Sequence, residues 1–137
     1  MKHILFLDVD GVLNCQIYYD TQPFKDYKEA KKQLKKDVKA ERIDRLDYYA
    51  SQICKERIKM LNSLCSETNS QVVVSSTWRS GKGIEELQEI FDYCGATFKV
   101  LDKTGHCECR TRGCEIRDWL QENVEKYFGI MYFDFYR

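Results

Sequence analysis

The sequence lacks the features that mark several special classes of protein. It has no apolar run longer than a few residues, so no segment is long enough to span a bilayer. It contains no internal repeat, low-complexity tract or linker. Its formal net charge is zero, so any basic patch must be local. With 137 residues, 43% of them hydrophobic, the chain is expected to form one domain, residues 1–137, around one core.

Seven cysteines do not form an obvious disulfide framework. Their number is odd, and four of them are scattered along the chain: Cys15, Cys54, Cys65 and Cys94. Three of these four lie in or beside apolar runs, where a reduced thiol behaves as a small hydrophobic group. In addition, Asp8 interrupts the apolar stretch that a signal peptide needs. We therefore expect a soluble, cytoplasmic protein with reduced thiols.

The other three cysteines lie close together in the sequence. Thiolates and imidazole bind zinc, and this segment offers both types of ligand: His106, Cys107, Cys109 and Cys114. Their spacing does not match the common finger or ribbon patterns, and no second cysteine pair lies nearby. The sequence alone therefore favours ordinary loop thiols over a zinc site.

Short apolar runs alternate with amphipathic stretches. The runs predict strands at residues 4–7, 71–74, 98–101 and 130–133. Apolar residues at helical spacing predict helices over about 53–65, over 84–94 and from about 113 onward. Strands that alternate with helices are typical of a parallel α/β sheet.

A highly charged stretch, residues 25–49, lies between the first two predicted strands. Within it, residues 25–39 contain seven lysines against three acidic residues. Ala30, Leu34 and Val38 recur there at helical spacing. Such a basic helical lid would draw a polyanion toward a nearby site. The alternative is a solvated helix with alternating charges, which is the usual outcome for a charge pattern of this kind.

Polar side chains follow three of the four predicted strands, at the point where each strand ends. In chain order they are Asp8, Asp10, Ser75, Ser76 and Asp134. Ligands of open α/β sheets bind beyond these carboxyl ends. The glycine after the two aspartates permits a turn that brings both to one site. A carboxylate nucleophile, a second carboxylate as acid and base, and Mg²⁺ together suit the hydrolysis of a phosphate ester.

The string DVDGVLN at residues 8–14, directly after an apolar strand, resembles the first signature of the haloacid dehalogenase (HAD) superfamily. The resemblance implies that Asp8 is the phosphate-accepting nucleophile and Asp10 its acid/base partner. The alternative is an aspartate pair that caps a helix or forms a turn. The string VVVS resembles the second superfamily motif, whose hydroxyl binds the phosphoryl group. Ser75 takes this role, with Ser76 as a close alternative.

The same resemblance implies a fold and a cofactor. The expected fold is a Rossmann-like three-layer α/β HAD domain, with a parallel sheet of strand order 3-2-1-4. A small helical cap is expected as an insertion at about residues 15–50. The expected cofactor is Mg²⁺, because superfamily members use it to neutralise charge on the phosphoryl group.

Two further strings resemble a narrower family, the HAD phosphatase domains of RNA-repair proteins, which are similar to the phosphatase half of polynucleotide kinases. They are SSTWR, which begins at Ser75, and RGCEIRDWL, which begins at Arg112. The resemblance implies that Arg79 and Arg112 bind substrate phosphate, with Arg110 and Lys103 as weaker candidates for the basic residue of the third motif. The alternative is that Arg79 is a surface arginine after a turn and that Arg112 is an ordinary arginine at a helix start.

The fourth superfamily motif normally supplies two acidic residues, and this chain has only Asp134 there. The metal ligands implied by the resemblance are therefore Asp8, Asp10 through its backbone carbonyl, and Asp134. Two functions remain open. One is a phosphohydrolase that acts through an aspartyl-phosphate. The other is a catalytically degenerate module, with an incomplete metal site, that binds phosphate or nucleic acid.

The expected partner is a phosphorylated small molecule, a nucleotide or a polynucleotide end, and no membrane. The closing run at residues 130–136 is rich in aromatic residues. If it forms an exposed edge strand, it would permit self-association.

Overall fold

The computed structural model describes residues 3–14, 32, 36 and 45–128 of the chain. In chain order its elements are β1 (His3–Leu7), α3 (Arg45–Ala50), α4 (Lys55–Thr68), β2 (Ser70–Val74), the 3-10 helix η1 (Thr77–Arg79), α5 (Ile84–Tyr93), β3 (Val100–Lys103) and α6 (Arg112–Phe128). The predicted alternation of strands and helices is confirmed for this part of the chain. No helix within it is long and apolar enough to cross a membrane.

The three strands form a parallel sheet in the order β1-β2-β3. β1 pairs with β2 along its whole length and ends with Leu7 opposite Val74. On the other side of β2, the same Val74 lies opposite Lys103 of β3. The predicted parallel α/β sheet is therefore confirmed. The fourth strand expected at residues 130–133, and most of the cap expected at about 15–50, lie outside the described residues.

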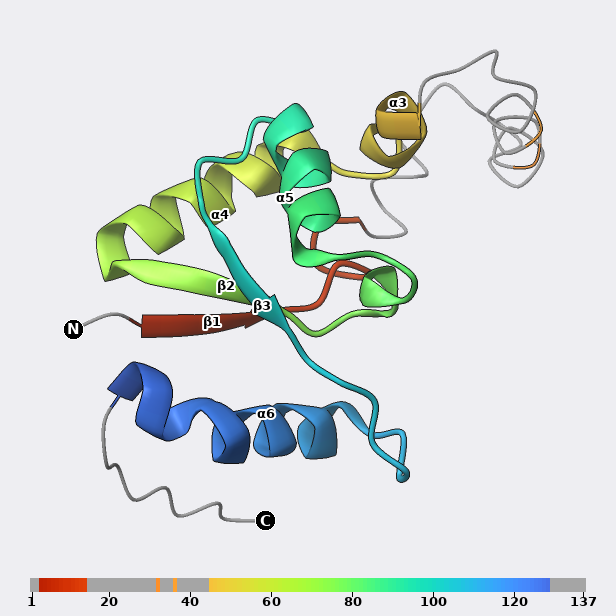
Figure 1. The fold of residues 1–137 in the computed structure, drawn as a ribbon. Helices are drawn as coiled ribbons and strands as arrows, with labels where there is room; N and C mark the ends of the chain where they lie inside the picture. Colours follow the sequence, from red (N-terminus) through yellow and green to blue (C-terminus); the bar gives the residue numbers. More distant parts are fainter. Residues whose placement is uncertain (1–2, 15–31, 33–35, 37–44, 129–137) are drawn as a thin grey trace.

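Helices cover both faces of this sheet, with α4 and α5 on one face and α6 on the other (Figure 1). Successive side chains of a strand point to opposite faces, so neighbours in β1 pack against different helices. Phe6 meets Trp119 of α6 edge to face, with 5.4 Å between the ring centroids. Leu7 lies on the opposite face in the main core. The result is the three-layer arrangement of a Rossmann-like domain.

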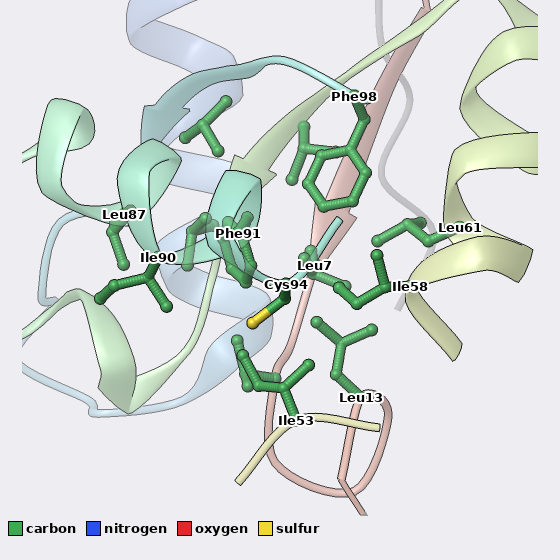
Figure 2. Packing of buried hydrophobic residues seen from close by; sticks show 14 of the residues in the cluster. Leu7, Leu13, Ile53, Ile58, Leu61, Leu87, Ile90, Phe91, Cys94 and Phe98 are labelled. Carbon is green, nitrogen blue, oxygen red and sulfur yellow. The ribbon is translucent and has the colours of Figure 1, made fainter. Parts of the chain in front are cut away.

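The main core fills the space between the sheet and helices α4 and α5. Figure 2 shows how its aliphatic and aromatic side chains converge: Leu7, Leu13, Ile53, Ile58, Leu61, Leu87, Ile90, Phe91 and Phe98. Cys65 and Cys94 belong to this core, and Cys54 is also a buried free thiol. Burial disfavours a thiolate and raises the pKa of Cys94 to about 11. The expected behaviour as small hydrophobic groups is confirmed for Cys65 and Cys94, whereas the buried Cys54 thiol also donates to Glu56 Oε2 at 3.4 Å.

The segments that follow the three strands continue side by side beyond the sheet. The Ser75 N–H donates to the Leu7 carbonyl at 2.8 Å, and the Thr104 N–H donates to the Val74 carbonyl at 3.0 Å. After β1 the chain turns back on itself at Gly11, whose φ of 83° lies in the left-handed region that glycine adopts without strain. Those motif residues that follow β1 and β2 are thereby gathered at one edge of the sheet.

Candidate functional site

A cleft of about 720 Å³ opens at the carboxyl edge of the sheet. The segment after β1 contributes Asp8 to its wall, and the first turn of α6 contributes Glu115. The wall also contains three arginines, Arg79, Arg110 and Arg112. Arginines that converge in a cleft bind phosphate and carboxylate groups through charge-assisted hydrogen bonds. The lining of this cleft therefore suits an anionic ligand next to a carboxylate.

Asp10 lies two residues beyond Asp8, and three donors fix the orientation of its carboxylate. Its Oδ1 atom accepts a hydrogen bond from Trp78 Nε1 at 3.1 Å and another from Asn14 Nδ2 at 3.2 Å. Its Oδ2 atom accepts one from Thr77 Oγ1 at 3.3 Å. Two of these donors belong to η1 and the third, Asn14, belongs to the DVDGVLN string. Residues of both strings therefore orient the Asp10 carboxylate.

The serines that the sequence predicts as phosphate ligands are buried. Ser75 is 1% exposed and accepts a hydrogen bond from Thr104 Oγ1 at 3.2 Å, whereas Ser76 is fully buried and caps η1 by accepting from the Trp78 N–H at 3.3 Å. The exposed hydroxyl of this segment belongs to Thr77, which lines the cleft. Sequence reasoning missed Thr77, although it is the third residue of the SSTWR string.

Arg79 is not a surface residue, because only 3% of it is exposed. Its Nη1 donates to the Ser76 carbonyl at 2.6 Å, and its Nη2 donates to Glu115 Oε2 at 2.7 Å. Among the described residues, the buried Arg79 Nε atom has no hydrogen-bond partner. The guanidinium therefore belongs to a buried ion pair at the base of the cleft.

Glu115 is the common partner of the basic residues around it. It is 6% exposed, and its Oε2 atom accepts hydrogen bonds from Arg79 and, at 3.0 Å, from Arg112 Nη1. His106 Nδ1 lies 3.8 Å from its Oε1 atom. Sequence reasoning assigned Glu115 no role, although the glutamate belongs to the RGCEIRDWL string. Its part in the structure is to hold two of the three cleft arginines.

The other predicted basic residues occupy different positions. Arg112 is the first residue of α6, and its side chain is 36% exposed at the cleft. Arg110, one of the two weaker candidates, lines the cleft as well. Lys103 instead donates to the Lys82 carbonyl at 2.6 Å and fastens β3 to the loop after η1. Asp134 lies outside the described residues.

The three thiols of the loop and the first turn of α6 meet in space at the rim of the cleft. The Sγ atoms of Cys107, Cys109 and Cys114 all lie within 4.8 Å of one another. Hydrogen bonds from Cys114, from the Thr111 hydroxyl and from Cys107 stabilise a thiolate at Cys109 and lower its pKa to about 6. The sequence gives the cysteine spacing but not this convergence, which depends on how the loop folds.

The fold and the cleft together define a Rossmann-like α/β domain with an arginine-lined cleft at the carboxyl edge of its sheet. Residues 4–131 match a family described as the HAD domain in Swiss Army Knife RNA repair proteins. The match spans most of the chain, so this protein belongs to that family. The resemblance to HAD domains of RNA-repair proteins is thereby confirmed. No curated protein and no solved structure matches the chain.

Proposed function

We propose that the protein is a Mg²⁺-dependent phosphohydrolase that removes a phosphate monoester through an aspartyl-phosphate on Asp8. One observation carries the proposal. Asp8 shares the lining of a cleft with three arginines, and the Asp10 carboxylate is held in a fixed orientation only two residues away. The residues proposed as nucleophile and as acid/base group thus lie at a cleft whose arginines would suit a phosphate anion.

The chemistry divides into two steps on the proposed residues. In the first, the Asp8 carboxylate attacks phosphorus, and protonated Asp10 gives its proton to the leaving alcohol oxygen. In the second, Asp10 takes a proton from water, which attacks the Asp8 phosphate and releases inorganic phosphate. Each cycle returns Asp8 to its carboxylate form and Asp10 to its protonated form.

The arginines and hydroxyls of the cleft are proposed to bind the phosphoryl oxygens. Arg112 is the strongest candidate, because its side chain is partly exposed at the cleft and Glu115 orients it. Ser75, Ser76 and Arg79 remain proposed phosphate contacts from the second motif. We add Thr77 to this group, since its hydroxyl lies on the lining of the cleft.

Mg²⁺ is the proposed cofactor, because carboxylate and carbonyl oxygens are the ligands it prefers. The half-buried Asp8 carboxylate on the wall of the cleft fits this requirement. With the backbone carbonyl of Asp10 and the carboxylate of Asp134, it would hold the ion. Bound there, Mg²⁺ would supply positive charge next to the phosphoryl oxygens.

The proposed substrate is a phosphorylated nucleotide or polynucleotide end. The family that the chain matches is described as a domain of RNA repair proteins. A cleft of about 720 Å³ also has room for more than a phosphate group. The alternative is a degenerate module that binds the same phosphorylated ends without cleaving them.

The experiment that tests the proposal measures phosphate release from p-nitrophenyl phosphate, nucleotides, and oligonucleotides with a 3′- or 5′-phosphate. Each substrate is assayed with Mg²⁺ and with an excess of chelator. We expect turnover with Mg²⁺ and its loss on chelation. If no substrate is cleaved but phosphorylated oligonucleotides bind in a fluorescence anisotropy titration, the result would favour the degenerate binding module over the phosphohydrolase. Release that is unaffected by chelation would contradict the proposed cofactor.

Replacing Trp78 with phenylalanine tests the proposed role of Asp10, because the variant removes the indole donor to its carboxylate and keeps an aromatic ring at this position of the core. Hydrogen bonds to charged groups contribute about 1.5–3 kcal/mol. We expect kcat to fall about tenfold or more with a smaller change in KM, because the proposed acid/base carboxylate loses one of the three donors that orient it.

Trp119→Phe is the matched control. Trp119 Nε1 also donates to a carboxylate, Asp102 Oδ2, at 2.7 Å, but it does so beneath α6 rather than at the cleft. Equal effects of the two substitutions on kcat and KM would show that Trp78 contributes to the fold alone.

A further inference from the structure

The cysteine cluster at the rim of the cleft has no role in the proposed hydrolysis. The Cys107 and Cys109 sulfurs lie 3.1 Å apart, and the Cys114 sulfur lies within 4.8 Å of both. Cys109 is exposed, whereas Cys107 and Cys114 are partly buried. None of the three belongs to the hydrophobic core, so packing does not account for their convergence.

The local backbone brings these thiols together. The Arg110 N–H donates to the Cys107 carbonyl at 3.1 Å and closes a tight turn. Arg110 itself has a φ of 52°, which lies in the left-handed region. This conformation is unfavourable in free energy for any residue other than glycine. The chain then enters α6, where the Cys114 N–H donates to the Thr111 hydroxyl at 3.4 Å. The turn at Cys107–Arg110 and the start of α6 thus bring the three sulfur atoms close together.

The separations match those of a thiolate metal site. Zinc–sulfur bonds of about 2.3 Å in a tetrahedron set the sulfurs ~3.8 Å apart. The observed separations, from 3.1 Å to at most 4.8 Å, bracket this value, so small side-chain rotations bring all three sulfurs to bonding distance. Arg110 and Arg112 lie between Cys109 and Cys114 in the sequence, and their positive charges offset the charge of three thiolates.

We propose that Cys107, Cys109 and Cys114 form a zinc site, with water as the fourth ligand. Soft thiolates select Zn²⁺, whereas the oxygen ligands around Asp8 select Mg²⁺, so the two sites prefer different ions. Zinc bound here fixes the loop between β3 and α6. That loop contributes His106, Cys107 and Arg110 to the wall of the cleft. The proposal does not depend on phosphatase activity.

The test uses the full chain, reduced and stripped of metal with a chelator that is then removed. One equivalent of Co²⁺ is added as a spectroscopic probe, because thiolate ligation produces sulfur-to-cobalt charge-transfer absorption that carboxylate ligation does not. Zn²⁺ is then titrated in to displace it. We expect one cobalt per chain with thiolate absorption, its loss on addition of Zn²⁺, and a higher Tm for the zinc-loaded protein.

The variants Cys109→Ser and Cys114→Ser should each lose the charge-transfer bands and the zinc-dependent rise in Tm. Their affinity for Zn²⁺ should fall more than about 100-fold, since even outer-shell partners of a bound metal account for about 10–100-fold. Cys65→Ala, which removes a core thiol, is the control and should bind metal like the wild type. Circular dichroism checks that each variant is folded. Weak binding by the wild type, unaltered binding by the serine variants, or a disulfide within the cluster under reducing conditions would overturn the proposal.

Discussion

Replacing Asp8 with asparagine is expected to lower phosphate release by at least about 1,000-fold, because an amide cannot attack phosphorus in place of a carboxylate. The substitution keeps the size and shape of the side chain. Asp8 is only half-buried at the wall of the cleft, so the fold should tolerate the change. The loss should therefore appear in turnover and not in the amount of folded protein.

Two measurements check this expectation. The first is the rate of phosphate release at saturating Mg²⁺, with Asp92→Asn as a control that removes the same charge from an exposed position on α5. The second is acid-quench trapping of phosphorylated protein. The wild type and Asp92→Asn should trap a phosphoryl group, and Asp8→Asn should trap none. Turnover by Asp8→Asn that equals the wild type would exclude Asp8 as the nucleophile.

The sequence predicted the three described strands well, because buried strands have a strong apolar signal. β1 and β2 lie where the apolar runs indicated. The third strand was predicted at residues 98–101, whereas β3 spans Val100–Lys103. Phe98 contributes to the core before the strand begins. The strand continues through Asp102 and Lys103. Asp102 accepts a hydrogen bond from the Trp119 indole, and Lys103 donates one to the loop after η1. These contacts lie far apart in the sequence, so a local pattern cannot show them.

The candidate site was predictable where a motif fixes a residue next to a strand end or at the start of a helix. Asp8 follows β1 directly, so the position of the strand is enough to place Asp8 at the cleft. The choice among Ser75, Ser76 and Thr77 depends on which way each side chain points as the strand turns into η1, and composition does not settle this. The thiol cluster depends on the left-handed turn at Arg110. Glu115 was missed because its buried partner, Arg79, comes from a different part of the chain.

The buried pair between Arg79 and Glu115 leads to the largest expected effect on stability. Their side chains are 3% and 7% exposed, and the hydrogen bond between Nη2 and Oε2 is 2.7 Å long. Replacing Glu115 with glutamine removes the negative charge while keeping the size of the side chain. The Arg79 guanidinium is then a buried charge without a counter-ion. We expect the free energy of unfolding to fall by about 3 kcal/mol.

Urea denaturation measures this loss as a lower midpoint at an unchanged slope. Glu122→Gln, on an exposed position of the same helix, is the charge-matched control and should change stability by less than about 0.5 kcal/mol. A double variant with methionine in place of both Arg79 and Glu115 separates the two causes of the effect. Since apolar side chains of similar volume often replace a buried ion pair at little cost, this variant should be more stable than Arg79→Met or Glu115→Met alone. Single variants as stable as the wild type would mean that the pair contributes little to the fold and is retained for its place at the cleft.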